Sequence, residues 1–257
     1  MERGNLYQKR DKTLRDKFND IAKEYEEFRF DYPSDLYKSI FSFASGGKKA
    51  MEIGIGTGKA TAPFLEKDYE IAAVEPIQNM LEIAREKYKG KRITFINSTF
   101  EDVTDTEQFD LIYAASSFQW INGCDRLDKV FKLLKVGGTF ARFKTVNIID
   151  EKKNENNRIL IEAYMRYLPE YLPCDIHKKH MKVEEYIQAG FKNLQREEFY
   201  VDHIFEAETY LKFVNTYTEY VALPLNIRKD FEKFIIENLS GKMIVITQKC
   251  TLFLAKK

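Results

Sequence analysis

The stretch AMEIGIGTG, residues 50–58, decides the fold, because three glycines at alternate positions follow a short apolar run that contains Glu52. Glycine allows positive φ and lets backbone N–H groups approach a ligand without a Cβ between them. The next residues, KATAPFLEK (59–67), are typical of a helix, whose first N–H groups have no intrahelical partner. The stretch therefore predicts a strand, a ligand-binding turn and a helix. A tight glycine-rich turn without a ligand is the alternative.

Strand-like and helical segments alternate on both sides of this turn. Strands are expected at 48–54, 70–76, 92–98, 109–117 and 139–146, and helices at 59–67, 77–89 and 124–135. Five strands separated by helices predict a parallel sheet with right-handed crossovers. Sheets of this kind bind ligands beyond the carboxyl ends of their strands, where the strand order reverses.

Two later strand-like runs, 193–205 and 242–257, complete the expected sheet. The predicted fold is Rossmann-like: seven mostly parallel strands, helices on both faces, and N-terminal helices and a helical insertion that cap the active site. We expect four segments. They are an N-terminal helical segment at 1–45, a cofactor-binding core at 46–146, a helical cap at 147–190, and C-terminal strands and helices at 191–257.

The composition excludes several classes of protein. The formal net charge of the 257 residues is +1, without the basic surplus that a phosphate backbone attracts, so we expect no nucleic-acid partner. No apolar run is long enough to cross a bilayer, and the N-terminus is too charged for a signal peptide, so we expect no membrane partner. Three scattered cysteines fit a reducing cytoplasm and suggest no metal site.

Two acids beside the glycines indicate the ligand class. The GxGxG spacing is one residue shorter than the dinucleotide fingerprint, and a carboxylate at Glu52 would repel a pyrophosphate and attract a cation. Glu75 ends the next strand, where an acid can accept two hydrogen bonds from the vicinal hydroxyls of a ribose. A cationic nucleoside without phosphate, S-adenosylmethionine, fits both acids.

Motifs along most of the chain are similar to those of a known family. FNDIAKEYEEFRFDYP (18–33), MEIGIGTGKAT (51–61), VEPIQNML (74–81), NSTFEDV (97–103), FDLIYAASSFQWI (109–121) and LLKVGGTFA (133–141) occur in the family's order. The sequence resembles the class I S-adenosylmethionine-dependent methyltransferases, in the type-11 small-molecule group, and in particular its trans-aconitate methyltransferase-like branch. Phe30 stands where that group usually has proline.

The resemblance implies a set of cofactor-binding residues. Glu52 would lie near the methionine ammonium, Glu75 on the ribose, and Arg29 on the methionine carboxylate. The full set that the resemblance implies is Tyr25, Arg29, Glu52, Gly54, Gly56, Thr57, Gly58, Glu75, Pro76, Met80, Thr99, Phe100, Glu101, Ala114, Ala115 and Ser116. Tyr25 and Met80 in the core, and Arg29 in a surface ion pair, are the alternatives.

The acceptor side of the reaction is less constrained by the sequence. Gln119 stands before Trp120 where the group often has histidine, and an amide orients an acceptor but cannot take its proton. That favours an acceptor that is already ionised, such as a carboxylate. His180 is a candidate base or anion contact, with an exposed histidine at a helix start as the alternative.

The sequence thus predicts an enzyme that transfers a methyl group from S-adenosylmethionine to a small molecule, an anionic carboxylate or another O or N nucleophile. The chain would work as a monomer or a homodimer. A protein that binds S-adenosylmethionine without transferring its methyl group is one alternative. A nicotinamide-dependent oxidoreductase is a second, which the glycine spacing and Glu52 oppose.

Overall fold

A seven-stranded sheet forms the centre of the computed structural model, which describes residues 12–44, 46–104, 108–123, 125–171 and 183–257. The strands are β1 (Lys49–Ile53), β2 (Glu70–Val74), β3 (Ile93–Ile96), β4 (Phe109–Ala115), β5 (Leu134–Ile149), β6 (Lys192–Glu206) and β7 (Met243–Lys256). Their order is β3-β2-β1-β4-β5-β7-β6. The first five strands pair in parallel, whereas β7 is antiparallel to both β5 and β6. The predicted fold class is confirmed, and the strand order reverses between β1 and β4.

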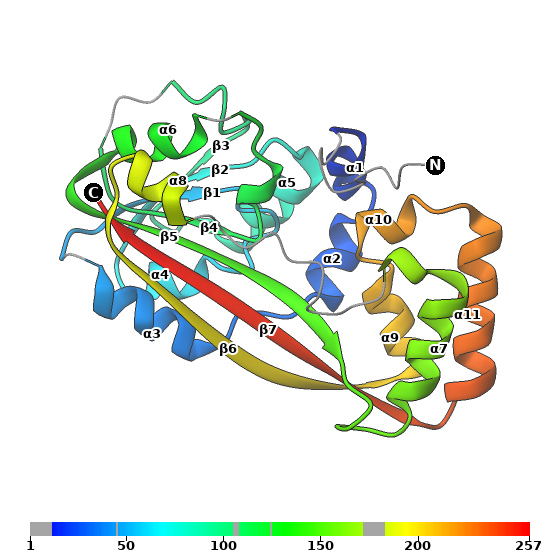
Figure 1. The fold of residues 1–257 in the computed structure, drawn as a ribbon. Helices are drawn as coiled ribbons and strands as arrows, with labels where there is room; N and C mark the ends of the chain where they lie inside the picture. Colours follow the sequence, from blue (N-terminus) through cyan, green and yellow to red (C-terminus); the bar gives the residue numbers. More distant parts are fainter. Residues whose placement is uncertain (1–11, 45, 105–107, 124, 172–182) are drawn as a thin grey trace, which may run out of the picture.

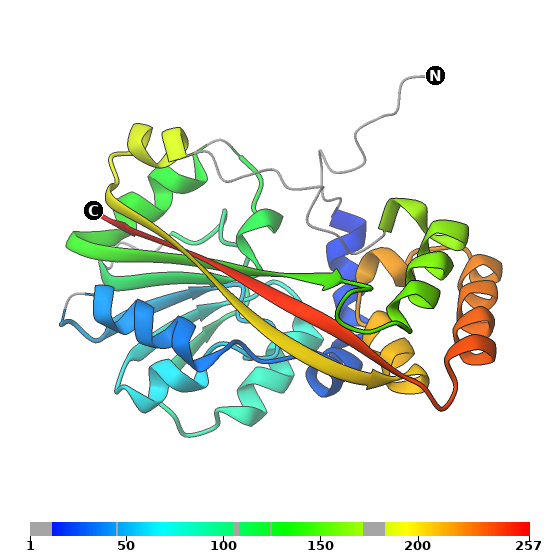
Figure 2. The ribbon, with the colours of Figure 1, turned by 60° about the horizontal axis from the view of Figure 1, so that its bottom comes forward.

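Helices cover both faces of the parallel part of the sheet (Figure 2). The helices α3 (Ser34–Phe43), α4 (Ala62–Glu66) and α5 (Gln78–Lys87) pack on one face, and α6 (Arg126–Leu133) and α8 (Val183–Gln188) pack on the other. Side chains alternate between the two cores: Leu111 and Tyr113 of β4 enter one, while Ile112 and Ala114 enter the other. Burial on both faces explains why the central strands are apolar throughout.

The strands β5, β6 and β7 are two to three times as long as the central strands and continue beyond the parallel core as a three-stranded arm (Figure 1). The arm carries a helical layer of α7 (Asn157–Tyr167), α9 (Ala207–Val214), α10 (Thr218–Val221) and α11 (Leu225–Leu239). This corrects the expected cap at 147–190. Among the described residues of that range α7 packs in the layer, whereas Tyr186 of α8 packs against Phe140 and Phe191 in a different core.

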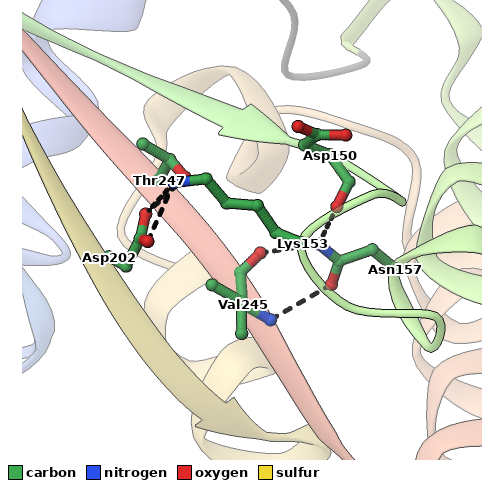
Figure 3. Close-up of polar contacts among 6 residues, drawn as sticks. All are labelled: Asp150, Lys153, Asn157, Asp202, Val245 and Thr247. Atoms are coloured by element: carbon green, nitrogen blue, oxygen red, sulfur yellow. Dashed lines mark hydrogen bonds and ion pairs between the residues drawn. The ribbon is translucent and has the colours of Figure 1, made fainter.

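The side chain of Asn157 links the helical layer to the arm through hydrogen bonds (Figure 3). Its amide donates to the carbonyl oxygens of Asp150 and Val245, both at 2.8 Å, and its Oδ1 accepts from the N–H of Val245 at 3.1 Å. The side chain thus continues the hydrogen bonding of β7 where β5 has ended. Nearby, Asp202 of β6 accepts from Lys153 at 2.6 Å and from Thr247 at 2.6 Å.

The N-terminal segment α1 (Lys12–Asp16), η1 (Lys17–Asn19) and α2 (Ala22–Phe28) lies between the core and the helical layer. Its residues contact α5 on one side and α9 and α10 on the other. Two short 3₁₀ turns, η2 (Phe118–Trp120) and η3 (Pro169–Tyr171), complete the regular structure. Within the ranges given above, no helix is both long and apolar enough to span a membrane.

Candidate functional site

A pocket opens at the carboxyl ends of β1, β2 and β4, on the side where the strand order reverses, and the N-terminal segment supplies its outer wall. Its volume is about 840 Å³, counting solvent at the mouth. Most of the predicted residues line it: Tyr25, Gly54, Gly56, Thr57, Glu75, Pro76, Met80, Thr99, Phe100, Glu101, Ala115, Ser116 and Trp120. These residues line one pocket, and their binding roles stay predictions.

The glycine loop needs its glycines for two physical reasons. Gly54, Gly56 and Gly58 all have positive φ, at 70°, 58° and 82°. A Cβ on Gly54 would lie 2.5 Å from the Cβ of Ser117, and one on Gly58 would lie 2.4 Å from the ring of Tyr88. A side chain at either position would therefore strain the backbone and displace a neighbour, which at Gly54 is Ser117 in the pocket wall.

Glu75 is held at the pocket wall by the glycine loop. Its Oε2 accepts from the N–H of Gly56 at 2.8 Å, and its Oε1 accepts from the N–H of Ile77 at 2.9 Å. Burial raises the pKa of this carboxyl to about 7, while the two N–H groups oppose the rise. Each oxygen retains a further lone pair, so the fixed carboxylate can accept hydroxyl groups from a ligand in the pocket.

Glu52 lies beneath the loop, outside the pocket lining, and is fully buried. Its Oε2 accepts from the hydroxyls of Thr61 at 2.7 Å and Tyr113 at 2.8 Å. Burial raises its pKa to about 7, and its Oε1 has no hydrogen-bond partner in the part of the chain that the structure describes. A buried carboxylate oxygen without a partner is stabilised by a nearby cation, so the residues present fit a ligand that carries positive charge.

Besides Glu52 and Gly58, four predicted residues lie outside the pocket lining or the described chain. Ala114 is fully buried below the floor, and Gln119 donates its amide to the carbonyl of Ser116. Arg29 donates to the carbonyl of Thr216 at 3.0 Å and lies 3.6 Å from the centre of the Tyr217 ring. His180 falls outside the described residues. The roles assigned to these four residues stay predictions.

Several lining residues were missed from the sequence: Arg15, Phe18, Tyr32, Lys59, Ser117 and Ile121. Tyr32 is the most informative, because its hydroxyl donates to Oγ of Ser116 at 2.9 Å. Ser116 itself has a positive φ of 53°, a backbone conformation that residues other than glycine rarely adopt. The tyrosine before Pro33 in the first motif was the available signal, but its direction depends on the turn between α2 and α3.

The described residues were also compared with the arrangement that a metal ion needs. No group of three or more His, Cys, Asp or Glu side chains is arranged to hold a metal ion in the ranges that the structure describes.

Comparison with known proteins agrees with this geometry. A family model described as "Methyltransferase domain" matches residues 50–138, which contain the glycine loop, Glu75 and the β4 end. The "Probable S-adenosylmethionine-dependent methyltransferase CRG1" of Saccharomyces cerevisiae is 35% identical over 129 residues, which cover 47% of this chain and 44% of that protein. The malonyl-[acyl-carrier protein] O-methyltransferase of Priestia megaterium is 30% identical over 138 residues, covering 49% of this chain and 48% of that one.

The match to solved structures extends over more of the chain. A candidate type II methyltransferase from Anaeromyxobacter dehalogenans superposes with a TM-score of 0.65 at 16% identity, covering 89% of this chain and 98% of that chain. This likeness concerns the fold. The chain spans about half the length of the curated relatives it matches. Residues 50–138 thus match the model of a methyltransferase domain, and the chain has the fold of the solved methyltransferase on which it superposes.

Proposed function

We propose that this chain transfers the methyl group of S-adenosylmethionine to a small-molecule acceptor that carries a carboxylate. The observation that carries the proposal is the pairing of the Gly54–Gly58 loop with the carboxyl of Glu75, fixed by the N–H groups of Gly56 and Ile77. The cofactor would supply a methyl group on a positively charged sulfur, activated for displacement. The protein's part is to hold it and to align the acceptor.

Three groups of residues would hold the cofactor. The glycine loop and Thr57 would face its methionine part, with the unpartnered carboxylate oxygen of Glu52 below. Glu75 would accept its ribose hydroxyls. Met80, Thr99 and Phe100 would border its adenine, with Phe100 almost fully buried and Thr99 near the mouth.

The acceptor class is argued from the proton chemistry of the pocket wall. The described lining holds no histidine, and its two carboxyls, Glu75 and Glu101, lie on the side assigned to the nucleoside. Tyr32 is partly buried and its phenol is held neutral, because desolvation raises its pKa far above the usual range. An acceptor that needs no proton removed at attack suits this wall, and a carboxylate is such an acceptor.

Two cations and one relative support an acidic acceptor. Arg15 and Lys59 both line the pocket, so an anion would meet two cations there, of which Lys59 also lies 3.7 Å from Asp31 and 3.9 Å from Glu26. The Priestia megaterium relative bears the name of an O-methyltransferase for malonyl-[acyl-carrier protein], and malonyl is an acidic group. Membership of the trans-aconitate methyltransferase-like branch is part of the same proposal, because aconitate is also a carboxylic acid.

The test uses methyl-labelled S-adenosylmethionine with a panel of small acids, and the matched amide or alcohol of each acid as its control. We expect S-adenosylhomocysteine release and a base-labile labelled methyl ester with at least one acid and none with its amide. Glu75→Gln should weaken cofactor binding in calorimetry by about tenfold, the effect of about 1.4 kcal/mol. Binding of S-adenosylmethionine without turnover on any acceptor would favour a binding protein. Binding of NAD in its place would overturn the proposal.

A further inference from the structure

The outer edge of β6 is long and has no partner strand. Its inner edge pairs with β7 from Lys192 to Glu206, and β6 is the last strand of the sheet. No described residue hydrogen-bonds to the backbone of its outer edge. The opposite edge of the sheet, β3, is only 4 residues long, whereas β6 has 15. An unpaired edge of this length presents a row of N–H and C=O groups that another strand can bind.

The usual protections of an edge strand are confined to one end of β6. Its register with β7 shifts between Lys192 and Gln195, and Asn193 there has a positive φ of 50°. From Gln195 to Glu206 the pairing is regular and the sequence contains no proline. On the face turned away from the helical layer, Tyr200 is 56% exposed and Ile204 is 67% exposed.

The exposed face of β6 is complementary to itself. In an antiparallel pair centred on Phe199, Arg196 of one copy lies opposite Asp202 of the other. The same register sets Glu198 opposite Tyr200. Each of these cross-strand pairs is of a stabilising kind, and the two-fold axis repeats each of them.

Neighbouring registers lose this match. Centring the pair on Tyr200 places Glu198 opposite Asp202, two like charges. Centring it on Glu198 places Leu194 opposite Asp202 and Lys192 opposite Ile204. Registers displaced by an odd number of residues join the exposed face of one copy to the helix-covered face of the other. The Phe199 register therefore avoids the mismatches of these neighbours.

We propose that a second copy of this chain pairs with β6 along its outer edge, antiparallel and centred on Phe199, so that two seven-stranded sheets become one. Arg196 of one copy then joins the Asp202 carboxylate that Lys153 and Thr247 already contact in the other. The nine residues from 195 to 203 would pair over roughly 30 Å. An interface of that size is small, so the dimer is expected to be reversible.

Cysteine crosslinking tests the register directly. Residues opposite each other in an antiparallel pair have Cα atoms about 4.5–5.5 Å apart, within the reach of a disulfide. In a background with Cys124 and Cys174 replaced by serine, and with Cys250, the β7 neighbour of Phe199, replaced by alanine, Phe199→Cys should form a disulfide-linked dimer under mild oxidation. Val201→Cys is the matched control, because its two copies would lie more than 10 Å apart at about 3.3 Å per residue. Absence of the Phe199→Cys dimer, in a variant whose circular dichroism is native, overturns the proposal.

Charge reversal tests the same register without cysteines. We expect the wild-type protein to sediment as a reversible dimer at tens of micromolar, and Arg196→Glu to weaken association at least tenfold. Arg92→Glu is the control. Arg92 is exposed and pairs with Glu70 near the β3 edge of the sheet, as Arg196 is exposed and pairs with Glu198 at the β6 edge. A wild-type protein that stays monomeric at 100 μM, or a dimer indifferent to Arg196→Glu, contradicts the proposal. Neither readout depends on methyl transfer.

Discussion

At the scale of single residues, Glu52 combines full burial with an unmatched carboxylate oxygen. Its pKa is raised from 4.5 to about 7, because burial outweighs the hydrogen bonds from Thr61 and Tyr113. The unfolded chain releases this proton near pH 4.5, while the folded chain keeps it until about pH 7. The stability that the neutral carboxyl contributes is thus complete below pH 4.5 and is lost as the pH rises to 7.

The first prediction follows from the loss of stability as the pH rises. Glu52→Gln keeps an oxygen acceptor for Thr61 and Tyr113 but removes the titration, so it should stabilise the ligand-free protein at pH 8 and not at pH 5. The upper limit is about 3 kcal/mol, or several degrees in Tm. Thermal melts at pH 5, 6, 7 and 8 measure the difference, with Glu70→Gln, an exposed acid, as control. A constant difference at all four pH values would contradict the assignment.

Arg29 has two competing roles that a ligand series separates. The resemblance assigns it to the methionine carboxylate, whereas the structure shows it bonded to the Thr216 carbonyl and stacked on Tyr217, beside Tyr25. If it positions Tyr25, Arg29→Ala should weaken S-adenosylhomocysteine and 5′-methylthioadenosine equally. If it binds the carboxylate, only the first ligand should weaken, by roughly tenfold or more. Calorimetry with both ligands measures the ratio, and Arg29→Lys shows how much charge alone restores.

At the scale of elements, the connection between the arm and the helical layer depends on Asn157. Asn157→Ala would leave the N–H and C=O of Val245 and the C=O of Asp150 without this partner, in a place where the side chain is fully buried. We expect a loss of about 2–4 kcal/mol in the free energy of unfolding, since each unsatisfied buried group costs about 1–3 kcal/mol. Urea denaturation measures it. Asn156→Ala, which removes one bond to the Met243 carbonyl, should cost less than about 1 kcal/mol.

At the scale of the whole molecule, the pocket joins parts of the chain that are distant in sequence. Its wall takes residues from α1, η1 and α2, and its floor takes residues from the ends of β1, β2 and β4. A ligand that fills it should therefore stabilise the complete fold. S-adenosylhomocysteine at 100 times its Kd should add about 2.7 kcal/mol, and raise Tm by several degrees. Hydrogen exchange should slow in residues 14–29 as well as in 53–58. Protection of the loop alone would show that the N-terminal segment takes no part in binding.

The sequence by itself determined the architecture and the floor of the site. The fold class could be inferred because alternating strands and helices allow few topologies. The glycine loop and Glu75 could be located because both lie within a few residues of a strand end, where position along the chain fixes position in space. Gly54, Gly56 and Glu75 accordingly line the pocket as expected.

Only the tertiary structure decided the outer wall and the layers of helices. Tyr32 reaches Ser116 across 84 positions of sequence, and Arg29 reaches Thr216 across 187. Asn157 takes the place of a strand neighbour for β7 by hydrogen bonding to Val245, 88 positions away. The periodicity of a segment shows which face is buried, but not which of several apolar surfaces will cover it. That choice depends on packing between elements. The helices α7 and α8 therefore lie in different cores, although the sequence analysis placed both in one cap.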